Sequence, residues 1–306
     1  MLTMLMRLSL IRRLYLWIKT VYTNACRIVP DDVYIKFIYR IKMGKKLNLD
    51  KPVSFNEKLQ WLKLHDRNEK YSVMVDKYLV RKYVAEKIGE GYLIPVLGVY
   101  DKVEDIDVNK LPGKFVIKCT HDSGSVVLCK EKQDFTQAVR KELNIALKRK
   151  YYYAYREFPY KNIKPRIIIE EMMYDKDSVG GGLIDYKFYC FHGEPKFLYI
   201  SSGLDNHRTA HISFYNLDLS EAPFQRKDYM QFDVIPKIPV NYQEMIEVAK
   251  VLSKEIPFVR IDLYEIDKKV YFSEITFSPT AGMMPFAPEE YDEILGSYID
   301  LDNLNK

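Results

Sequence analysis

Short apolar runs joined by tight turns dominate the chain after residue 92, and this pattern constrains the fold more than any other feature. The run 185–191 passes through a turn at 192–195 into a second run at 196–201, and 258–265 turns at Asp267 into 270–277. Strands joined by so few residues pair antiparallel, because a parallel connection needs a dozen residues or more. We therefore predict a mixed α+β fold and not a doubly wound βαβ sheet.

Helical repeats account for much of the remaining chain. Apolar residues recur at helical spacing from 31 to 71, and Ser54 ahead of this repeat's second half is typical of a helix N-cap. Further helices are predicted over 76–88, 135–152 and 242–255, and further strands over 93–100, 114–119, 126–129 and 166–172. The sequence has no G-x-G-x-x-G after a strand and no P-loop motif.

The net charge of +5 originates in the N-terminal segment. The chain has 306 residues, and residues 1–30 carry five basic side chains and no acidic one, so the rest of the chain sums to zero. A near-neutral body argues against a nucleic-acid partner. The four cysteines form no C-x-x-C pair, which indicates reduced thiols in a cytoplasmic protein and no zinc site.

The same N-terminal segment is amphipathic. On a helix, Leu14, Trp17 and Ile18 lie on one side, whereas Arg12 and Lys19 lie opposite. These charges interrupt the apolar runs too often for a transmembrane span or a cleaved signal peptide. Two interpretations stay open: residues 1–28 contact the anionic inner face of a membrane, or they pack on the body of the chain.

A Ser/Gly turn between two strands is a candidate phosphate site. The strand 114–119 carries Lys118 near its end, and Ser123, Gly124 and Ser125 lead into the next strand. Backbone N–H groups and hydroxyls in such a turn can bind phosphate oxygens beside the lysine charge. The alternative is an ordinary turn, because a lysine before a strand turn is common.

Charged residues alternate with apolar ones in the hairpin 258–277. Arg260 and Asp262 share one face of their strand, and so do Glu274 and Thr276. Two carboxylates on adjacent apolar strands are costly to bury without a compensating cation, and such oxygen ligands suit Mg²⁺ bridging nucleotide phosphates. The alternative is an ion pair between Arg260 and an acid on an exposed face of the sheet.

Two further strands combine apolar and polar residues. Glu170 and Glu171 follow an apolar run and lead to Met173, a pattern that can offer backbone groups to an adenine edge and methionine to its face. Lys187 alternates with aromatic neighbours and can face the same cleft. Ordinary solvated side chains are the alternative at both places.

The order of these motifs resembles the ATP-grasp superfamily of carboxylate–amine ligases over residues 54–300. Within it, PVSFNEKLQW at 52–61, DKYLVRKY at 76–83 and FSEITFSPTAG at 272–282 resemble the TupA-like branch, named for teichuronopeptide synthesis and encoded with polysaccharide-assembly enzymes. The resemblance implies an ATP-grasp fold in which the nucleotide is held between two mainly antiparallel β-sheet subdomains. It also implies three domains: a helical region with an amphipathic helix at 1–75, a lid subdomain at 76–165 and a C-terminal subdomain at 166–306.

The resemblance assigns a role to each candidate site residue, with ATP and Mg²⁺ as cofactors. The residues expected to contact ATP phosphates are Lys77, Lys118, Ser123, Gly124, Ser125 and Lys187. Those expected to contact adenine and ribose are Glu170, Glu171, Met173 and Asp177. The expected Mg²⁺ ligands are Asp262, Glu274 and Thr276, and the expected catalytic residues are Arg260 and Lys187. The superfamily usually has asparagine at the position of Thr276, which is a better metal ligand than a hydroxyl.

The implied activity is ATP-dependent amide formation through an acyl phosphate. Its expected partners are a uronic-acid carboxylate of a cell-surface or capsular polysaccharide and an amino acid or other amine. A glycosyltransferase is one alternative, supported only by D-x-D patterns at 105–107, 175–177 and 300–302. A non-catalytic ATP-grasp scaffold is the other alternative, because of Thr276.

Overall fold

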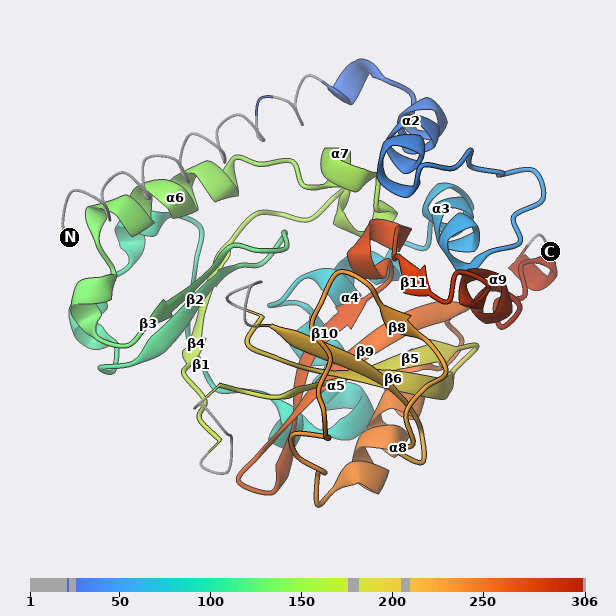
Figure 1. Cartoon of the computed structure of the whole chain (residues 1–306). Helices are drawn as coiled ribbons and strands as arrows, with labels where there is room; N and C mark the ends of the chain where they lie inside the picture. Colours follow the sequence, from blue (N-terminus) through green and yellow to red (C-terminus); the bar gives the residue numbers. More distant parts are fainter. Residues whose placement is uncertain (1–20, 22–25, 176–181, 205–209, 305–306) are drawn as a thin grey trace. The chain divides into compact units, whose positions relative to one another are not determined.

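The computed structural model describes residue 21 and residues 26–175, 182–204 and 210–304 (Figure 1). Its contacts divide the chain into two compact units, each assembled from separate segments. Unit 1 combines the described residues up to Tyr34 with Asn68–Val80 and Ile94–Met172. Unit 2 contains Ile35–Arg67, Arg81–Leu93 and the described residues from Met173 onward. The three consecutive domains 1–75, 76–165 and 166–306 stay a prediction.

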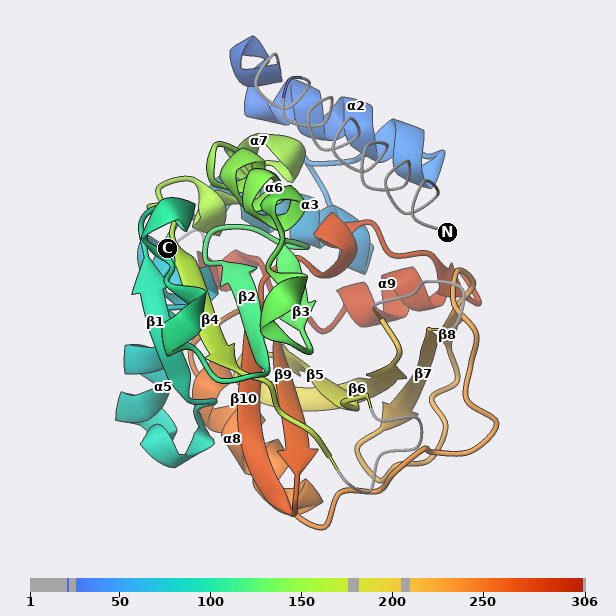
Figure 2. The ribbon, with the colours of Figure 1, turned by 90° about the vertical axis from the view of Figure 1, so that its left-hand side faces the viewer.

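Unit 1 is built on a four-stranded antiparallel sheet with the strand order β1-β4-β2-β3. Figure 2 shows these four strands side by side in that order. Its strands are β1 (Val96–Tyr100), β2 (Phe115–Cys119), β3 (Val126–Cys129) and β4 (Ile167–Glu171). Its helices in the described residues are η1 (Cys26–Ile28), α4 (Lys70–Val75), η3 (Val103–Asp105), η4 (Val108–Lys110), η5 (Lys132–Asp134), α6 (Gln137–Leu147), α7 (Tyr152–Tyr155) and η6 (Phe158–Tyr160). Every strand falls inside a segment predicted from the sequence.

The two faces of the unit 1 sheet differ in chemistry. On one face, Phe115 and Ile117 of β2 pack with Ile169 of β4 in a buried core that includes Leu143 of α6. Side chains alternate along a strand, so Lys118 of β2 points to the opposite face. The sheet is therefore apolar where α6 covers it and charged on its other side.

Unit 2 is built on a five-stranded antiparallel sheet with the strand order β10-β9-β5-β6-β7. Its strands are β5 (Asp185–Phe191), β6 (Glu194–Ser202), β7 (His211–Asn216), β9 (Phe258–Ile266) and β10 (Lys269–Thr276), and β8 (Gln225–Arg226) pairs with β11 (Phe286–Ala287). Its helices in the part of the chain that the structure describes are most of α2 (Asp31–Met43) and of α5 (Val80–Ile88), together with α3 (Phe55–His65), η2 (Glu90–Tyr92), α8 (Tyr242–Ser253), η7 (Pro279–Gly282), α9 (Tyr291–Gly296) and η8 (Asp302–Leu304). The sequence predicted the pairs β5–β6 and β9–β10 but not β7, β8, β11 or α9.

α8 covers one face of the unit 2 sheet, and α3 covers part of the other. Phe55 of α3 lies against Phe258 of β9 and Phe191 of β5, with ring centroids 4.9 and 6.1 Å apart. These rings belong to a larger buried aromatic cluster on this face. Aromatic residues make up 14% of the sequence, and this cluster of them fills the core beneath α3.

Ser54 caps α3 as the sequence predicts. Its Oγ accepts a hydrogen bond from the backbone N of Glu57 at 3.3 Å, and a Glu57 carboxylate oxygen accepts one from the backbone N of Ser54 at 3.3 Å. This reciprocal capping box satisfies two N–H groups that a helix start otherwise leaves free. The local sequence signal is sufficient to fix where α3 begins.

Two predicted helix boundaries are wrong. The helix predicted over 76–88 is α5 (Val80–Ile88), because the Asp76 carboxylate accepts from the backbone N of Tyr78 and Leu79 at 2.8 and 3.0 Å and forms a turn. The helix predicted over 135–152 ends at residue 147, because Arg149 turns inward to an ion pair with Asp122. At Asp76 the side chain thus competes with the helix for backbone N–H groups.

The predicted amphipathic helix within residues 1–28 lies largely outside the described residues. α2 (Asp31–Met43) follows it and crosses from unit 1 into unit 2. Among the described residues, no helix combines the length and apolar character needed to cross a bilayer.

Candidate functional site

Strand register places four polar residues in one row across the unit 2 sheet. Glu274 of β10 pairs with Asp262 of β9, Asp262 pairs with Lys187 of β5, and Lys187 pairs with Tyr199 of β6. Directly paired residues on antiparallel strands point to the same face. Tyr189 lies two residues from Lys187 on β5, so its side chain points to the same face, and it belongs to the aromatic core beneath α3. The row of polar residues therefore lies on the sheet face that α3 covers further along the strands.

Two cationic side chains bind Asp262. Lys187 donates from Nζ to Oδ2 at 2.7 Å, while Arg260 donates from Nε to Oδ1 at 2.6 Å and from Nη2 to Oδ2 at 2.7 Å. Asp262 has no solvent-exposed surface, and the exposed fractions of Lys187 and Arg260 are only 6% and 8%. An ion pair involving Arg260 therefore exists, but it is buried and not on an exposed sheet face.

Mutual attraction keeps these groups charged despite burial. Burial lowers the pKa of Lys187, but the carboxylates of Asp185 and Asp262 outweigh it and raise the pKa well above its usual value. Asp185 accepts from Lys187 at 2.8 Å. Burial raises the pKa of Asp262, but Arg260 and Lys187 outweigh it and lower the pKa. The site is thus a fixed charge array of the kind that can stabilise charge on a reacting group.

The donor set beside this array fits a magnesium ion. A carboxylate offers about four lone-pair positions, and Asp262 uses three of them in the bonds described above. Glu274, half-buried on the next strand, has no hydrogen bond or ion pair to another described residue. Thr276 pairs with Arg260 in the next row, and its hydroxyl accepts from Arg260 Nη2 at 3.1 Å.

Mg²⁺ commonly binds one or two protein carboxylates and completes its shell with phosphate oxygens and water. The described residues contain no group of three or more acidic, histidine or cysteine side chains placed to hold a metal. A site with Glu274 and the remaining lone pair of Asp262 fits this mode of binding, in which phosphates supply the other ligands.

A strained loop follows β10 directly. Thr280, Ala281 and Gly282 all lie in the left-handed region, with φ of 53°, 55° and 65°. This conformation costs a residue other than glycine roughly 1–2 kcal/mol, so it persists only where neighbouring contacts enforce it. Strained backbone of this kind is concentrated at functional sites.

α3 supplies the contacts that hold this loop. Gln60 donates from Nε2 to the carbonyl oxygens of Gly282 and Ala281 at 2.6 and 3.1 Å. Lys63 donates from Nζ to the Ala281 carbonyl at 2.6 Å and to Gln60 Oε1 at 3.0 Å. Gln60 has no exposed surface, and Lys63 is also buried. A buried polar stripe on α3 therefore fixes the chain just after the strand that carries Glu274.

Asn56 extends this stripe by one helical turn. Its side chain donates to the Met284 carbonyl at 2.9 Å and accepts from the Met284 backbone N at 2.7 Å. The stripe and the loop come from 52–67 and 272–284, which include two of the three segments that resemble the TupA-like branch. These two segments are thus physical partners within unit 2.

Unit 1 contains two of the three lysines expected to contact ATP phosphates, Lys77 and Lys118. Lys118 Nζ lies 2.7 Å from a carboxylate oxygen of Glu170, and the Lys118 side chain is 25% exposed to solvent. Lys77 Nζ donates to the backbone carbonyl of Asp122. Each lysine therefore has an oxygen partner within unit 1 that a phosphate would replace or join.

The Ser/Gly loop between β2 and β3 is anchored at its base and exposed at its tip. Arg149 contacts the buried Asp122 carboxylate and donates to Ser125 Oγ at 2.8 Å, and Ser125 donates to Asp122 at 2.6 Å. Ser123 and Gly124 are exposed, and Gly124 has a φ of 92°. The hydroxyl of Ser125 is thus engaged, whereas the loop tip presents its groups to solvent.

The expected nucleotide-base residues occupy different environments. Glu170 is buried and paired with Lys118, whereas Glu171 is exposed and donates from its backbone N to the Pro95 carbonyl at 3.0 Å. Met173 is half-buried. Asp177, expected at the ribose, lies outside the described residues.

The sequence analysis did not identify Arg149 or Tyr199. Arg149 lies among lysines in a predicted helix, where a basic residue normally faces solvent, so no local signal marks it. Tyr199 accepts from Arg260 Nη1 at 3.1 Å. The sequence does not reveal this partner, because the turn that closes at Phe191 and Glu194 would by itself place Leu198 opposite Lys187. A bulge between Tyr189 and Cys190 shifts the register by one residue and brings Tyr199 there instead.

Three solved structures illustrate what this chain is similar to. The ATP-grasp ligase PsnB, complexed with a phosphomimetic precursor variant, Mg and ADP, has a TM-score of 0.40 at 10% identity over 72% of this chain and 57% of its own. D-alanine–D-alanine ligase from Bacillus anthracis has a TM-score of 0.42 at 13% identity, over 76% of this chain and 69% of its own. D-alanyl-alanine synthetase A from Vibrio cholerae has a TM-score of 0.42 at 10% identity, over 79% of this chain and 62% of its own. This chain thus spans 57–69% of the length of these proteins.

The three TM-scores lie below 0.5, so the family assignment rests on sequence alone. No curated protein matches the chain. The family model described as TupA-like ATPgrasp matches residues 57–300, which is most of the chain and almost the stretch identified from the motifs. The predicted α+β, ATP-grasp fold class is confirmed by this match and by the two antiparallel sheets. The chain belongs to the TupA-like ATP-grasp family.

Proposed function

We propose that this protein is an ATP-dependent carboxylate–amine ligase. In the first step, a substrate carboxylate attacks the γ-phosphate of ATP and gives an acyl phosphate and ADP. In the second, an amine displaces phosphate and forms an amide. Family membership supports the reaction class, and the buried array of Lys187, Arg260 and Asp262 is the observation that carries the proposal.

The array suits this chemistry because phosphoryl transfer depends mostly on positioning and on neutralising negative charge. Lys187 is oriented by Asp185 and Asp262 and would contact the γ-phosphate. Arg260 is oriented by Asp262 and Tyr199 and would stabilise the oxyanion of the tetrahedral adduct. Both cations are fixed before a substrate arrives, so little reorganisation accompanies the reaction.

We assign the metal and nucleotide contacts on the same basis. Asp262 and Glu274 would hold Mg²⁺, with Thr276 nearby, and the ion would neutralise phosphate charge. The residues assigned to ATP phosphates are Lys77, Lys118, Ser123, Gly124 and Ser125, and those assigned to adenine and ribose are Glu170, Glu171, Met173 and Asp177. The exposed loop tip and the partly exposed Lys118 support the phosphate assignment.

The proposed acceptor is a uronic-acid carboxylate of a cell-surface or capsular polysaccharide, and the proposed donor is an amino acid or another amine. Support comes from the TupA-like branch, whose members are encoded with polysaccharide-assembly enzymes. The basic, amphipathic segment 1–28 would bring the enzyme to the inner membrane face, where such glycans are assembled.

The test is ADP release by purified protein with ATP, Mg²⁺, a uronic-acid glycan and a mixture of amino acids. We expect release that depends on both the glycan and the amino acids, and an amide product detectable by mass spectrometry. Glu274→Gln should abolish release, because it removes the carboxylate available to the metal, and Lys118→Ala should lower it strongly.

The matched control is Glu104→Gln, an exposed acid whose carboxylate contacts Asn144 in unit 1, outside the assigned groups. It should turn over like the wild type. UDP release from a UDP-sugar in the absence of ATP would instead establish the glycosyltransferase alternative. Binding of ATP without turnover under any acceptor would favour the scaffold.

A further inference from the structure

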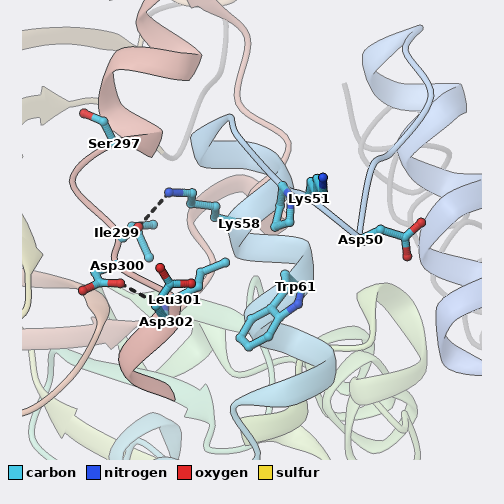
Figure 3. Close-up of a pocket in the computed structure, with 10 residues that line it drawn as sticks. Asp50, Lys51, Lys58, Trp61, Ser297, Ile299, Asp300, Leu301 and Asp302 are labelled. Carbon is cyan, nitrogen blue, oxygen red and sulfur yellow. Dashed lines mark hydrogen bonds between the residues drawn. The ribbon is translucent and has the colours of Figure 1, made fainter. Parts of the chain in front are cut away.

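A groove of about 460 Å³ lies in unit 2 between α3 and the chain that follows α9 (Figure 3). One wall is formed by Lys58 and Trp61 of α3, and the other by residues from 297 to 302. Lys58 Nζ donates to the Ile299 carbonyl at 2.7 Å and ties the two walls together. Its volume lies in the range of pockets that bind small ligands. None of its lining residues belongs to the charged array or to the strained loop.

Trp61 provides a fixed aromatic surface in this groove. Its ring stacks on His65, with centroids 4.3 Å apart and planes inclined by 26°. Figure 3 shows the indole leaving α3 on the side that faces the second wall. A ring already immobilised on one face can bind the CH-rich face of a sugar ring with little further loss of side-chain freedom.

The remaining lining offers hydrogen-bonding groups of both kinds. Asp300 and Asp302 have carboxylates that accept, and Lys51 and Lys58 have ammonium groups that donate. Ser297 Oγ donates its proton to the Ile294 carbonyl at 2.6 Å, so towards a ligand it can only accept. A sugar hydroxyl both donates and accepts, so its recognition needs such a mixed set. An aromatic platform bordered by mixed polar groups is a site for a polyhydroxylated ring.

The charges in the groove argue against phosphate ligands. Asp50, Asp300 and Asp302 outnumber Lys51 and Lys58, so the lining carries a net charge of −1. A doubly charged phosphate or a nucleotide would be repelled most by the three carboxylates, because the repulsion grows with the charge of the ligand. A sugar unit that carries no charge or a single one is repelled less, and its hydroxyls can donate to the same carboxylates. The groove therefore has a different ligand from the Ser/Gly loop of unit 1.

α3 connects the groove to the strained loop. Lys58 and Trp61 line the groove, while Gln60 and Lys63 of the same helix hold Ala281. A helix with its side chains is about 10 Å in diameter, so groove and loop are separated by roughly one helix. An oligosaccharide can extend over this distance, whereas a single sugar cannot occupy both places.

We propose that this groove binds sugar residues of the acceptor glycan next to the one that carries the reacting carboxylate. The inference rests on the proposed function, because it assumes that the acceptor is a glycan. The groove makes the enzyme selective for oligomers, since sugars that do not react contribute binding through Trp61. A single uronic acid lacks this contact and binds more weakly.

Direct binding tests the groove without catalysis. Calorimetric titration without ATP would use tetragalacturonate and maltotetraose as probes, and galacturonate as the short comparison. We expect a tetrasaccharide to bind the wild type, and Trp61→Ala to weaken that binding about tenfold, as loss of an aromatic contact does. Trp61→Tyr should restore most of the affinity, because it returns a ring to the same position.

The matched control is Phe37→Ala, which removes an aromatic side chain of α2 that is 58% exposed and outside the groove. It should bind like the wild type, and circular dichroism would show that each variant is folded. Failure of both tetrasaccharides to bind, or equal affinity in Trp61→Ala, overturns the proposal. Binding of lysine or glycine amide at Trp61 in place of sugars also overturns it, because the groove would then serve the amine.

ADP release separates this inference from the proposed function. If tetrasaccharides bind through Trp61 but no acceptor gives ADP, the ligase assignment fails and the groove remains. If ADP release has the same KM for one-unit and four-unit acceptors in wild type and in Trp61→Ala, the groove assignment fails and the ligase remains. A KM that rises only for the four-unit acceptor in Trp61→Ala supports both.

Discussion

At the scale of single residues, the unit 2 site is defined by how Asp262 shares its oxygens. Lys187 and Arg260 both bind it, and Asp185 adds a second carboxylate to Lys187. Breaking a buried pair is more costly than never forming it, because the remaining charge is left uncompensated. The carboxylate of Asp262 therefore matters both for the stability of the fold and for the proposed chemistry. The carboxylate of Glu274 has no partner among the described residues, so it matters for the chemistry alone.

Asp262→Asn should destabilise the protein by about 3 kcal/mol, because it leaves Lys187 and Arg260 without a shared counter-charge. Glu274→Gln is the comparison and should not lower stability, although both variants should lose ADP release. Urea unfolding followed by fluorescence measures the difference. Equal stability of Asp262→Asn and wild type would contradict the buried array.

His121 in unit 1 makes stability depend on pH. Burial lowers the pKa of His121 and outweighs Asp122 and the hydrogen bond from Nε2 to the Ala146 carbonyl at 3.2 Å, which both raise it. The folded state therefore takes up a proton at lower pH than the unfolded state does. An unfolded histidine takes up a proton near pH 6.5. As pH falls below this value the unfolded state gains protons first, and stability is lost until the folded pKa is reached.

His121→Gln should therefore flatten the stability profile between pH 7.5 and 5.5. The urea midpoint at the two pH values, in wild type and variant, measures this, and the comparison of slopes tolerates a lower absolute stability of the variant. Asp262, whose pKa is lowered, acts only below about pH 3.8, the ordinary value for an aspartate. An unchanged slope in the variant would assign the acid sensitivity elsewhere.

At the scale of elements, α3 has three different surfaces. Phe55 and Leu59 pack in the aromatic core, Gln60 and Lys63 hold the strained loop, and Trp61 lines the groove. The sequence predicts this helix and its cap, because both signals are local. It does not predict the stripe of buried polar residues, which looks like an ordinary solvated face until residues 281–284 are placed beside it.

Gln60→Leu should reduce both stability and turnover. It removes the hydrogen bonds to the Ala281 and Gly282 carbonyls. Lys63 still donates to Ala281, but the Gly282 carbonyl loses the bond from Gln60, and a buried polar group left without a partner costs about 1–3 kcal/mol. ADP release should fall while the affinity for an ATP analogue stays unchanged. Gln137→Leu, an exposed position on α6, is the matched control and should behave like the wild type. A Gln60→Leu enzyme with full kcat would separate the loop from catalysis.

At the scale of the whole molecule, the chain forms two units, each with its own antiparallel sheet and buried core. Hairpins could be predicted because their partners are neighbours in sequence, as in β5–β6 and β9–β10. The order β1-β4-β2 could not, because β4 inserts between strands that precede it by about fifty residues or more. Likewise, Lys187 and Asp262 could be named as candidates, but their bond spans 75 positions.

Nucleotide binding should stabilise the whole chain. A non-hydrolysable ATP analogue with Mg²⁺ at 100 times its Kd should add about 2.7 kcal/mol if it binds only the folded protein. Thermal unfolding would show this as a rise of several degrees in Tm. Lys118→Ala should reduce the rise, and a UDP-sugar should not produce it. A Tm unaffected by the analogue would contradict the assignment of ATP as cofactor.

The strained loop has a consequence for the order in which the protein is made. Gln60 and the Ala281 carbonyl that it binds are 221 positions apart. At about 5–20 residues per second, a ribosome needs roughly 10–45 s to travel from one to the other. During that time α3 has left the ribosome without the chain that covers its polar stripe. Unit 2 therefore closes last, and substitutions on α3 should reduce the yield of folded protein during synthesis more than they destabilise the finished molecule.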